Sequence, residues 1–270
     1  MKKLIIFLIT IFSFAIFHQC TKSTIQNNEI SSKEINNEFD YNNFINSLKE
    51  KGIFLSHEKK INLRSELTGD GCYNPGLGCV RDTITDTISV PGFCDNVFVS
   101  VEVWFCVGQP RLIFTNFSAL PMGGCDSLWN SWLSLSDDDL DRELDQFDYA
   151  ASLIVEEIIM KEFCLALGII CPYSAVEAHY YKNMCYQWCV KIISRPGEPI
   201  LGNIGQVSCG RKCCLRTRTY CYEGNGIFTI SNPVFTEIGT SNCGSQPISG
   251  NCDGDLIGRC DRTCGKPWQI

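Results

Sequence analysis

Alternating apolar and polar residues predict a β-hairpin after residue 90. Residues 95–107 place valine or phenylalanine at every second position, which gives the expected strand one apolar face. Gly108, Gln109 and Pro110 follow as a turn signal, and residues 112–117 form a second apolar segment. Residues 83–90 show the same alternation more weakly and predict a third strand. This part of the chain is therefore expected to form a small antiparallel sheet.

Helical spacing replaces the alternation after residue 135. Ser136 is a suitable N-cap, and the three aspartates that follow it place negative charge where the helix dipole favours it. The helix is expected to end near residue 167, because Gly168 follows. Apolar residues recur every three or four positions, at Leu140, Leu144, Phe147, Ala151, Ile154 and Ile158. This apolar stripe predicts that the helix covers the sheet and that the two form the main core.

Beyond the helix the chain returns to short apolar segments separated by glycine, proline, asparagine and serine. We expect strands near residues 186–193, 212–222 and 227–230, and disulfide-bonded loops from residue 242 onward. The predicted fold class is therefore α+β, with a small antiparallel sheet covered by one long helix and followed by a disulfide-rich region of short strands and loops. We assign residues 71–270 to one cysteine-rich domain, with a division near residue 180 as the alternative.

The first 19 residues have the pattern of a signal peptide. Lys2 and Lys3 precede an uncharged, mostly apolar stretch at residues 4–17, which is shorter than the roughly 20 residues that span a membrane. Cys20 closes this stretch, and the segment resembles the signal of bacterial exported lipoproteins, although Gln19 stands where that family has a small residue. The resemblance implies acylation of Cys20 and a lipid anchor in the membrane. Cleavage after Ala15 is the alternative.

Residues 20–70 are predicted to form a tether. The segment after Cys20 is rich in asparagine, serine, glutamate and lysine and has few apolar residues to bury. One short helix is expected between residues 40 and 52, with Phe44, Ile45 and Leu48 on one side and Gly52 at its end. This helix would dock the tether on the domain.

The chain has 18 cysteines, and ten of them lie between Cys185 and Cys264. Export into an oxidising compartment makes disulfides the expected state of these residues. If Cys20 is acylated, an odd number remains, and Cys164 is expected to stay free because it lies in an apolar helical segment. The pairing is left open by the sequence. The disulfide candidates are Cys72, Cys79, Cys94, Cys106, Cys125, Cys171, Cys185, Cys189, Cys209, Cys213, Cys214, Cys221, Cys243, Cys252, Cys260 and Cys264.

Metal binding and cofactor chemistry are not expected. The chain contains no C-x-x-C, and only His57 and His179 follow the leader, so common zinc sites and thioredoxin-like motifs are missing. A G-x-S-x-G nucleophile motif is also missing. The sequence therefore predicts no catalytic residues, no metal site and no cofactor.

The charge balance argues against nucleic acid as a partner. The net charge is −7, whereas phosphate binding requires an excess of lysine and arginine. A basic cluster at Arg211, Lys212, Arg216 and Arg218 is expected to be a solvated strand face, with binding of a glycan or another anionic ligand as the alternative.

Taken together, these patterns predict an exported, lipid-anchored, disulfide-stabilised protein with a binding or structural role in the cell envelope. It is either anchored to the membrane or secreted, and its ligand is a glycan or a protein. The alternative is a secreted hydrolase that uses two carboxylates. Acidic residues that converge in one cleft would favour the hydrolase. A groove lined by tryptophans would favour binding, and the candidates are Trp129, Trp132, Trp188 and Trp268.

Overall fold

The computed structural model describes residues 41–61, 72–73, 79–106, 109–193, 201–239, 242–245 and 252–265. A compact unit begins at Phe39. The expected signal peptide, Cys20 and the polar segment up to residue 40 lie outside the described residues, as does Trp268.

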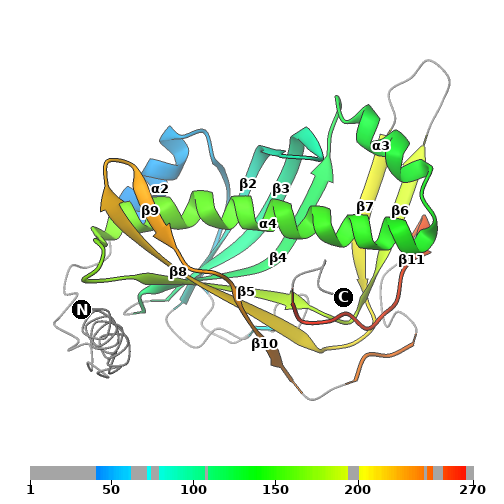
Figure 1. Cartoon of the computed structure of the whole chain (residues 1–270). Coiled ribbons are helices and arrows are strands. Elements are labelled where there is room, and N and C mark those ends of the chain that lie inside the picture. The colour runs from blue at the N-terminus through cyan, green and yellow to red at the C-terminus, as the bar shows by residue number, and fades with distance from the viewer. Residues whose placement is uncertain are drawn as a thin grey trace, which may run out of the picture. The chain divides into compact units, whose positions relative to one another are not determined.

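Three helices and eleven strands occupy the described residues (Figure 1). The helices are α2 (Tyr41–Glu50), α3 (Asp126–Leu133) and α4 (Asp137–Leu167). The strands are β1 (Phe54–Ile61), β2 (Cys79–Val90), β3 (Cys94–Cys106), β4 (Arg111–Pro121), β5 (Val176–Asn183), β6 (Tyr186–Ile193), β7 (Leu201–Ser208), β8 (Cys213–Gly224), β9 (Ile227–Ile230), β10 (Val234–Ile238) and β11 (Asp255–Ile257).

The main sheet has eight strands in the order β1-β2-β3-β4-β5-β8-β10, with β9 paired to β8. The α+β class is as predicted, but the expectation of a small antiparallel sheet is wrong on size and on one pairing. β4 and β5 run parallel from Arg111 to Phe114 of β4. The helices α3 and α4 form the connection between these two strands, and a parallel pair requires such a long crossover.

Helix α4 lies across the main sheet (Figure 1). It starts where the sequence predicts, because the Ser136 hydroxyl accepts a hydrogen bond from the Asp139 backbone N–H at 3.3 Å. It ends at Gly168, which has a left-handed φ of 61°. Leu144, Ala151 and other predicted stripe residues are buried in the core. The predicted long helix is therefore present and packs on the sheet, although the sheet is larger than predicted and α2 and α3 accompany α4.

The expected docking helix is α2. Its apolar residues Phe44, Ile45 and Leu48 are buried, and the Phe44 ring meets that of Phe163 on α4 edge to face at 5.6 Å. Strand β1 follows α2 and pairs with β2. Helix α2 and strand β1 thus lie within the segment that the sequence assigns to the tether.

A second sheet of three antiparallel strands has the order β11-β6-β7. β7 carries Gly202, and a Cβ atom at this position would lie 2.3 Å from the Trp129 ring of α3. Glycine is therefore required there for the close packing of this ring against the strand. The expected loops near the C-terminus contribute β11, which pairs with β6 at Trp188–Val190.

The sixteen candidate cysteines form eight disulfides. The adjacent Cys213 and Cys214 pair with different partners, because neighbouring strand residues point to opposite faces. Cys164 is free and buried. The bridges are Cys72–Cys213, Cys79–Cys106, Cys94–Cys125, Cys171–Cys221, Cys185–Cys243, Cys189–Cys252, Cys209–Cys260 and Cys214–Cys264.

Candidate functional site

A cavity of about 320 Å³ lies where β4 and β5 separate. The two strands pair only as far as Phe114 and Tyr180. Asn116 then adopts a left-handed φ of 50°, and the β3–β4 register shifts at the same point, so β4 bends away. β6 and β7 of the second sheet border the other side. In α/β sheets, ligands bind in the crevice beyond the carboxyl ends of parallel strands, which is where this cavity lies.

The cavity wall combines polar and aromatic side chains. Five elements contribute to it, since Asp148 of α4 joins residues from β4, β5, β6 and β7. The volume lies at the lower end of the range for small-molecule sites. The lining residues are Asn116, Phe117, Ser118, Ala119, Asp148, Tyr180, Tyr181, Lys182, Asn183, Tyr186, Trp188, Ile204, Gly205, Gln206 and Ser208.

Lys182 supplies the accessible charge of the cavity. Its Nζ donates a hydrogen bond to Oδ2 of Asp148 at 2.7 Å. The Lys182 side chain is 26% exposed, whereas that of Asp148 is 5% exposed. The ammonium also lies 4.9 Å from the ring centre of Tyr186 and 5.8 Å from that of Trp188. A ligand in the cavity would therefore meet a cation held in place by a buried carboxylate and two aromatic rings.

The ion pair determines the protonation state of Lys182. Burial alone would lower the pKa of the ammonium, but Asp148 and the neighbouring Tyr186, Asp145 and Tyr180 together raise the pKa well above its ordinary value. Burial raises the pKa of the Asp148 carboxyl, and Lys182 acts on it in the opposite direction. The raised pKa keeps the Lys182 ammonium protonated near neutral pH, in direct contact with Asp148.

Tyr180 brings a second donor to the cavity. Its side chain is buried between the Phe114 ring and the Arg216 guanidinium, which lies 4.3 Å from the ring centre. The Tyr180 hydroxyl makes no hydrogen bond to any described residue, yet it is not sealed from solvent. Burial raises the pKa of this phenol, so the hydroxyl stays protonated. A buried tyrosine hydroxyl usually has a partner, and here a ligand could supply it.

A row of ion pairs, which we call the charged seam, lies next to Lys182 and Tyr180. It consists of four carboxylates spaced along one face of α4 and four basic residues that meet them. The expectation that the basic cluster is solvated is wrong for Arg216 and Arg218, because both are buried against α4. The seam residues are Asp141, Asp145, Asp148 and Glu156 on α4, and Lys182, Arg216, Arg218 and Arg262 opposite them.

The centre of the seam is the pair Arg216 and Glu156. Arg216 donates to Oε2 of Glu156 from Nη2 at 2.7 Å and from Nε at 3.2 Å, and to the Ser152 hydroxyl at 3.0 Å. The other oxygen of Glu156 accepts a hydrogen bond from the Tyr220 hydroxyl at 2.7 Å. These contacts hold Arg216 beneath the Tyr180 ring and so fix one wall of the cavity.

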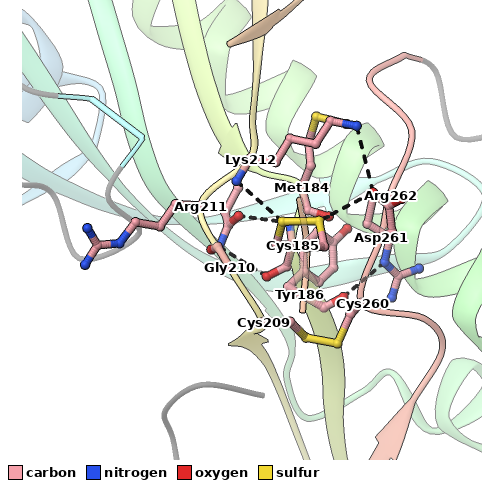
Figure 2. Close-up of a disulfide and its surroundings, with 12 residues drawn as sticks. Met184, Cys185, Tyr186, Cys209, Gly210, Arg211, Lys212, Cys260, Asp261 and Arg262 are labelled. Carbon is pink, nitrogen blue, oxygen red and sulfur yellow. Dashed lines mark hydrogen bonds and ion pairs between the residues drawn. A yellow bond between two sulfur atoms is a disulfide. The ribbon is translucent and has the colours of Figure 1, made fainter. Parts of the chain in front are cut away.

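Disulfides hold the end of the seam. In the C-terminal segment (residues 252–265), Arg262 donates from Nε to the Tyr186 carbonyl at 3.2 Å and from Nη1 to Asp145 at 3.2 Å. Figure 2 shows Arg262 beside Tyr186, with the Cys209–Cys260 bridge next to them. The Tyr186 hydroxyl and the Trp188 indole N–H also donate to Asp145, at 2.6 and 3.0 Å. The disulfides thus position two aromatic residues of the cavity.

A smaller cavity of about 70 Å³ lies against the same residues, bordered by Arg216, Phe235 and Arg262. Its volume is well below that of a typical small-molecule site. The functional candidate is therefore the larger cavity.

The four tryptophans named from the sequence as groove candidates do not all lie in one place. Trp129 and Trp132 are buried in the core and do not line the cavity, so that expectation is wrong for both. Trp188 lines the cavity, and Trp268 lies outside the described residues. His179 Nε2 lies 2.7 Å from Oε2 of Glu177, within hydrogen-bond distance.

Asp148, Tyr180 and Lys182 form what we call the cavity floor, and sequence reasoning missed all three. Val176, Ala178, Tyr180 and Lys182 alternate along one strand, so a lysine shares the face of buried apolar residues. This alternation was an available signal for a lysine with a buried partner. Asp145 and Asp148, three residues apart, lie on one helix face in the same way.

Among the described residues, no three histidine, cysteine, aspartate or glutamate side chains lie close enough to hold a metal ion. No helix in the described ranges has the length and apolar content needed to cross a membrane. Comparison of the chain with protein-family models, with curated proteins and with solved structures finds no match.

Proposed function

We propose that the protein is an exported, lipid-anchored binding protein whose disulfide-stabilised domain takes a small polar ligand in the cavity between β4 and β7. The observation that carries this proposal is the polar cavity lining, where the partly exposed Lys182 lies beside Tyr180, whose hydroxyl has no partner among the described residues. A polar group in a largely enclosed cavity favours a partner that completes its hydrogen bonds, and a ligand can supply that partner.

The hydrolase alternative has less support. Asp145 and Asp148 converge at the smaller cavity, as that alternative requires. However, Asp145 accepts hydrogen bonds from two aromatic residues and Arg262, and Asp148 accepts one from Lys182. Carboxylates engaged in this way serve as structural ion-pair partners. Binding is therefore the better interpretation of the site.

The binding role is tested by filling the cavity. Gln206 lines the cavity, is exposed and pairs with Trp188, another lining residue, so Gln206→Phe is expected to place a ring on the cavity face of β7 without disturbing the fold. Gly123 has open space around it and lies outside the cavity, so Gly123→Phe is the matched control. Thermal unfolding of the full chain is measured with a panel of sugars, sugar acids and amino acids.

We expect at least one panel member to raise the Tm of the wild type and of Gly123→Phe but not that of Gln206→Phe. A bound ligand at 100 times its Kd stabilises by about 2.7 kcal/mol, which such a measurement resolves. The proposal fails if no ligand shifts the Tm, or if Gln206→Phe responds like the wild type.

The anchor is tested by intact mass of the chain expressed with its own leader in a bacterial host. Acyl chains on Cys20 that disappear in Cys20→Ser would support the lipid anchor. A mass that corresponds to cleavage after Ala15, without acylation, would instead make the protein freely secreted.

A further inference from the structure

The donors at the cavity floor indicate the chemical class of the ligand. An ammonium has three N–H donors and no acceptor, and one donor of Lys182 is used by Asp148. The ammonium lies near the Tyr186 and Trp188 rings, and the Lys182 side chain lines the cavity and is 26% exposed, so its other donors are accessible to a ligand. The Tyr180 hydroxyl adds a neutral donor without a partner among the described residues. The group that binds here must therefore accept hydrogen bonds, and a negative charge would strengthen them.

The negative charge of Asp148 does not cancel this preference. Its side chain is almost entirely buried, and its Oδ2 faces the ammonium rather than open space. Because the Lys182 side chain is 26% exposed and that of Asp148 only 5%, the ligand would contact the cation more than the carboxylate. Asp148 acts here as a positioning residue that keeps Lys182 charged and oriented.

The rest of the wall favours a small hydroxylated acid over a phosphate. Bidentate phosphate recognition uses arginine. Both Arg216 and Arg262 border the smaller cavity and are engaged by carboxylates of α4. The exposed side chains of Ser118 and Gln206 offer hydrogen bonds to hydroxyl groups at the rim of the larger cavity.

We infer that the cavity binds a carboxylate-bearing sugar, with Lys182 and Tyr180 as the residues that contact the carboxylate. This inference rests on the proposed binding function and names its ligand class. The sugar hydroxyls would face Ser118 and Gln206, and the sugar ring would lie against the aromatic side chains of the wall.

Glucuronate and glucose form a matched pair of probes, because they differ only in a carboxylate against a hydroxymethyl group. Calorimetric titration of the full chain is expected to give tighter binding of glucuronate by about 10- to 100-fold, since a charged hydrogen bond contributes about 1.5–3 kcal/mol. A disaccharide that ends in glucuronate forms a third arm. Tighter binding of the disaccharide than of free glucuronate would assign a glycan as the source, and the reverse would assign the free acid.

Tyr180→Phe is the sharpest variant, because it removes a hydroxyl that has no partner among the residues that the structure describes. We expect an unchanged Tm and about 10-fold weaker binding of glucuronate. Tyr220→Phe is the matched control, because it removes a hydroxyl that donates to Glu156 away from the cavity lining. It should lower the Tm and leave the affinity unchanged.

Lys182→Met removes the charge and leaves Asp148 buried alone, so the double variant Lys182→Met/Asp148→Asn is measured beside it. Both are expected to lose the preference for glucuronate over glucose. The inference is overturned if glucose binds as tightly as glucuronate, or if Tyr180→Phe and the double variant keep the wild-type affinity. Binding of neutral sugars alone would overturn the ligand class but leave the proposed function standing. Absence of any binding across the sugar panel would overturn both.

Discussion

Removing Glu156 should destabilise the domain far more than removing its main partner, Arg216. Arg216 has almost no solvent contact and makes three side-chain hydrogen bonds, two of them to Glu156. Glu156→Leu leaves the guanidinium buried with only the Ser152 hydroxyl. The loss of one partner of a buried ion pair costs about 3–5 kcal/mol.

Arg216→Met should lower the free energy of unfolding by less than Glu156→Leu does. In that variant Glu156 keeps the hydrogen bond from the Tyr220 hydroxyl and an ion pair with Arg218 at 3.5 Å. The carboxylate therefore remains partly compensated, and we expect a loss of about 1–3 kcal/mol. The double variant Glu156→Leu/Arg216→Met leaves no uncompensated charge at this position, so it should be more stable than Glu156→Leu alone.

Equilibrium unfolding in urea, followed by near-ultraviolet circular dichroism with the disulfides intact, gives the three free energies. The m-value should stay constant, because the surface exposed on unfolding changes little. Two results would refute the reasoning. One is a cost for Glu156→Leu no larger than that for Arg216→Met, and the other is a double variant whose cost equals the sum of the single costs.

Three further predictions concern packing, the free thiol and pH. Gly202→Ala should destabilise by about 1–3 kcal/mol through overpacking against Trp129, whereas Gly205→Ala, with open space around it, should be near neutral in the same unfolding assay. Burial raises the pKa of Cys164 to about 12, so iodoacetamide at pH 8 should modify it only after unfolding in urea without reductant, as peptide mapping would show. Because the folded-state pKa of Lys182 is raised, its charge should persist as pH rises, and glucuronate affinity should be constant between about pH 6 and pH 9; a tenfold decline in that range would contradict the Lys182–Asp148 pair.

Local patterns predicted the elements whose signal lies within one segment. The alternation at residues 95–107 corresponds to β3, and the capping serine, apolar stripe and terminal glycine of α4 are where the sequence places them. β7 was missed because Gly202 and Gly205 weaken its strand pattern, and its pairing depends on β6 and the Trp129 ring. Whether such a segment forms a strand depends on packing with residues far away in the sequence, which a short stretch of sequence does not reveal.

The candidate site was hidden for a related reason. In the sequence, Asp145 and Asp148 belong to an acidic run that is typical of an exposed helix start, and Arg216 belongs to a basic cluster that is typical of a solvated strand. In the structure the three residues border the same small cavity. Each charged residue is expected on the surface when taken alone, since burial of a charge is costly. A charged side chain can be buried only when an oppositely charged side chain pairs with it. Here the paired residues come from distant parts of the sequence.

The order of the disulfides along the chain has a consequence for the protein after cleavage. Cys72–Cys213, Cys171–Cys221 and Cys214–Cys264 overlap end to end, so at least one bridge spans every peptide bond between residues 72 and 264. A protease that cuts this region once therefore releases no fragment, and the two pieces separate only after reduction. In a compartment rich in proteases and poor in reductants, a nicked molecule would keep its seam and its cavity walls joined in one covalent unit.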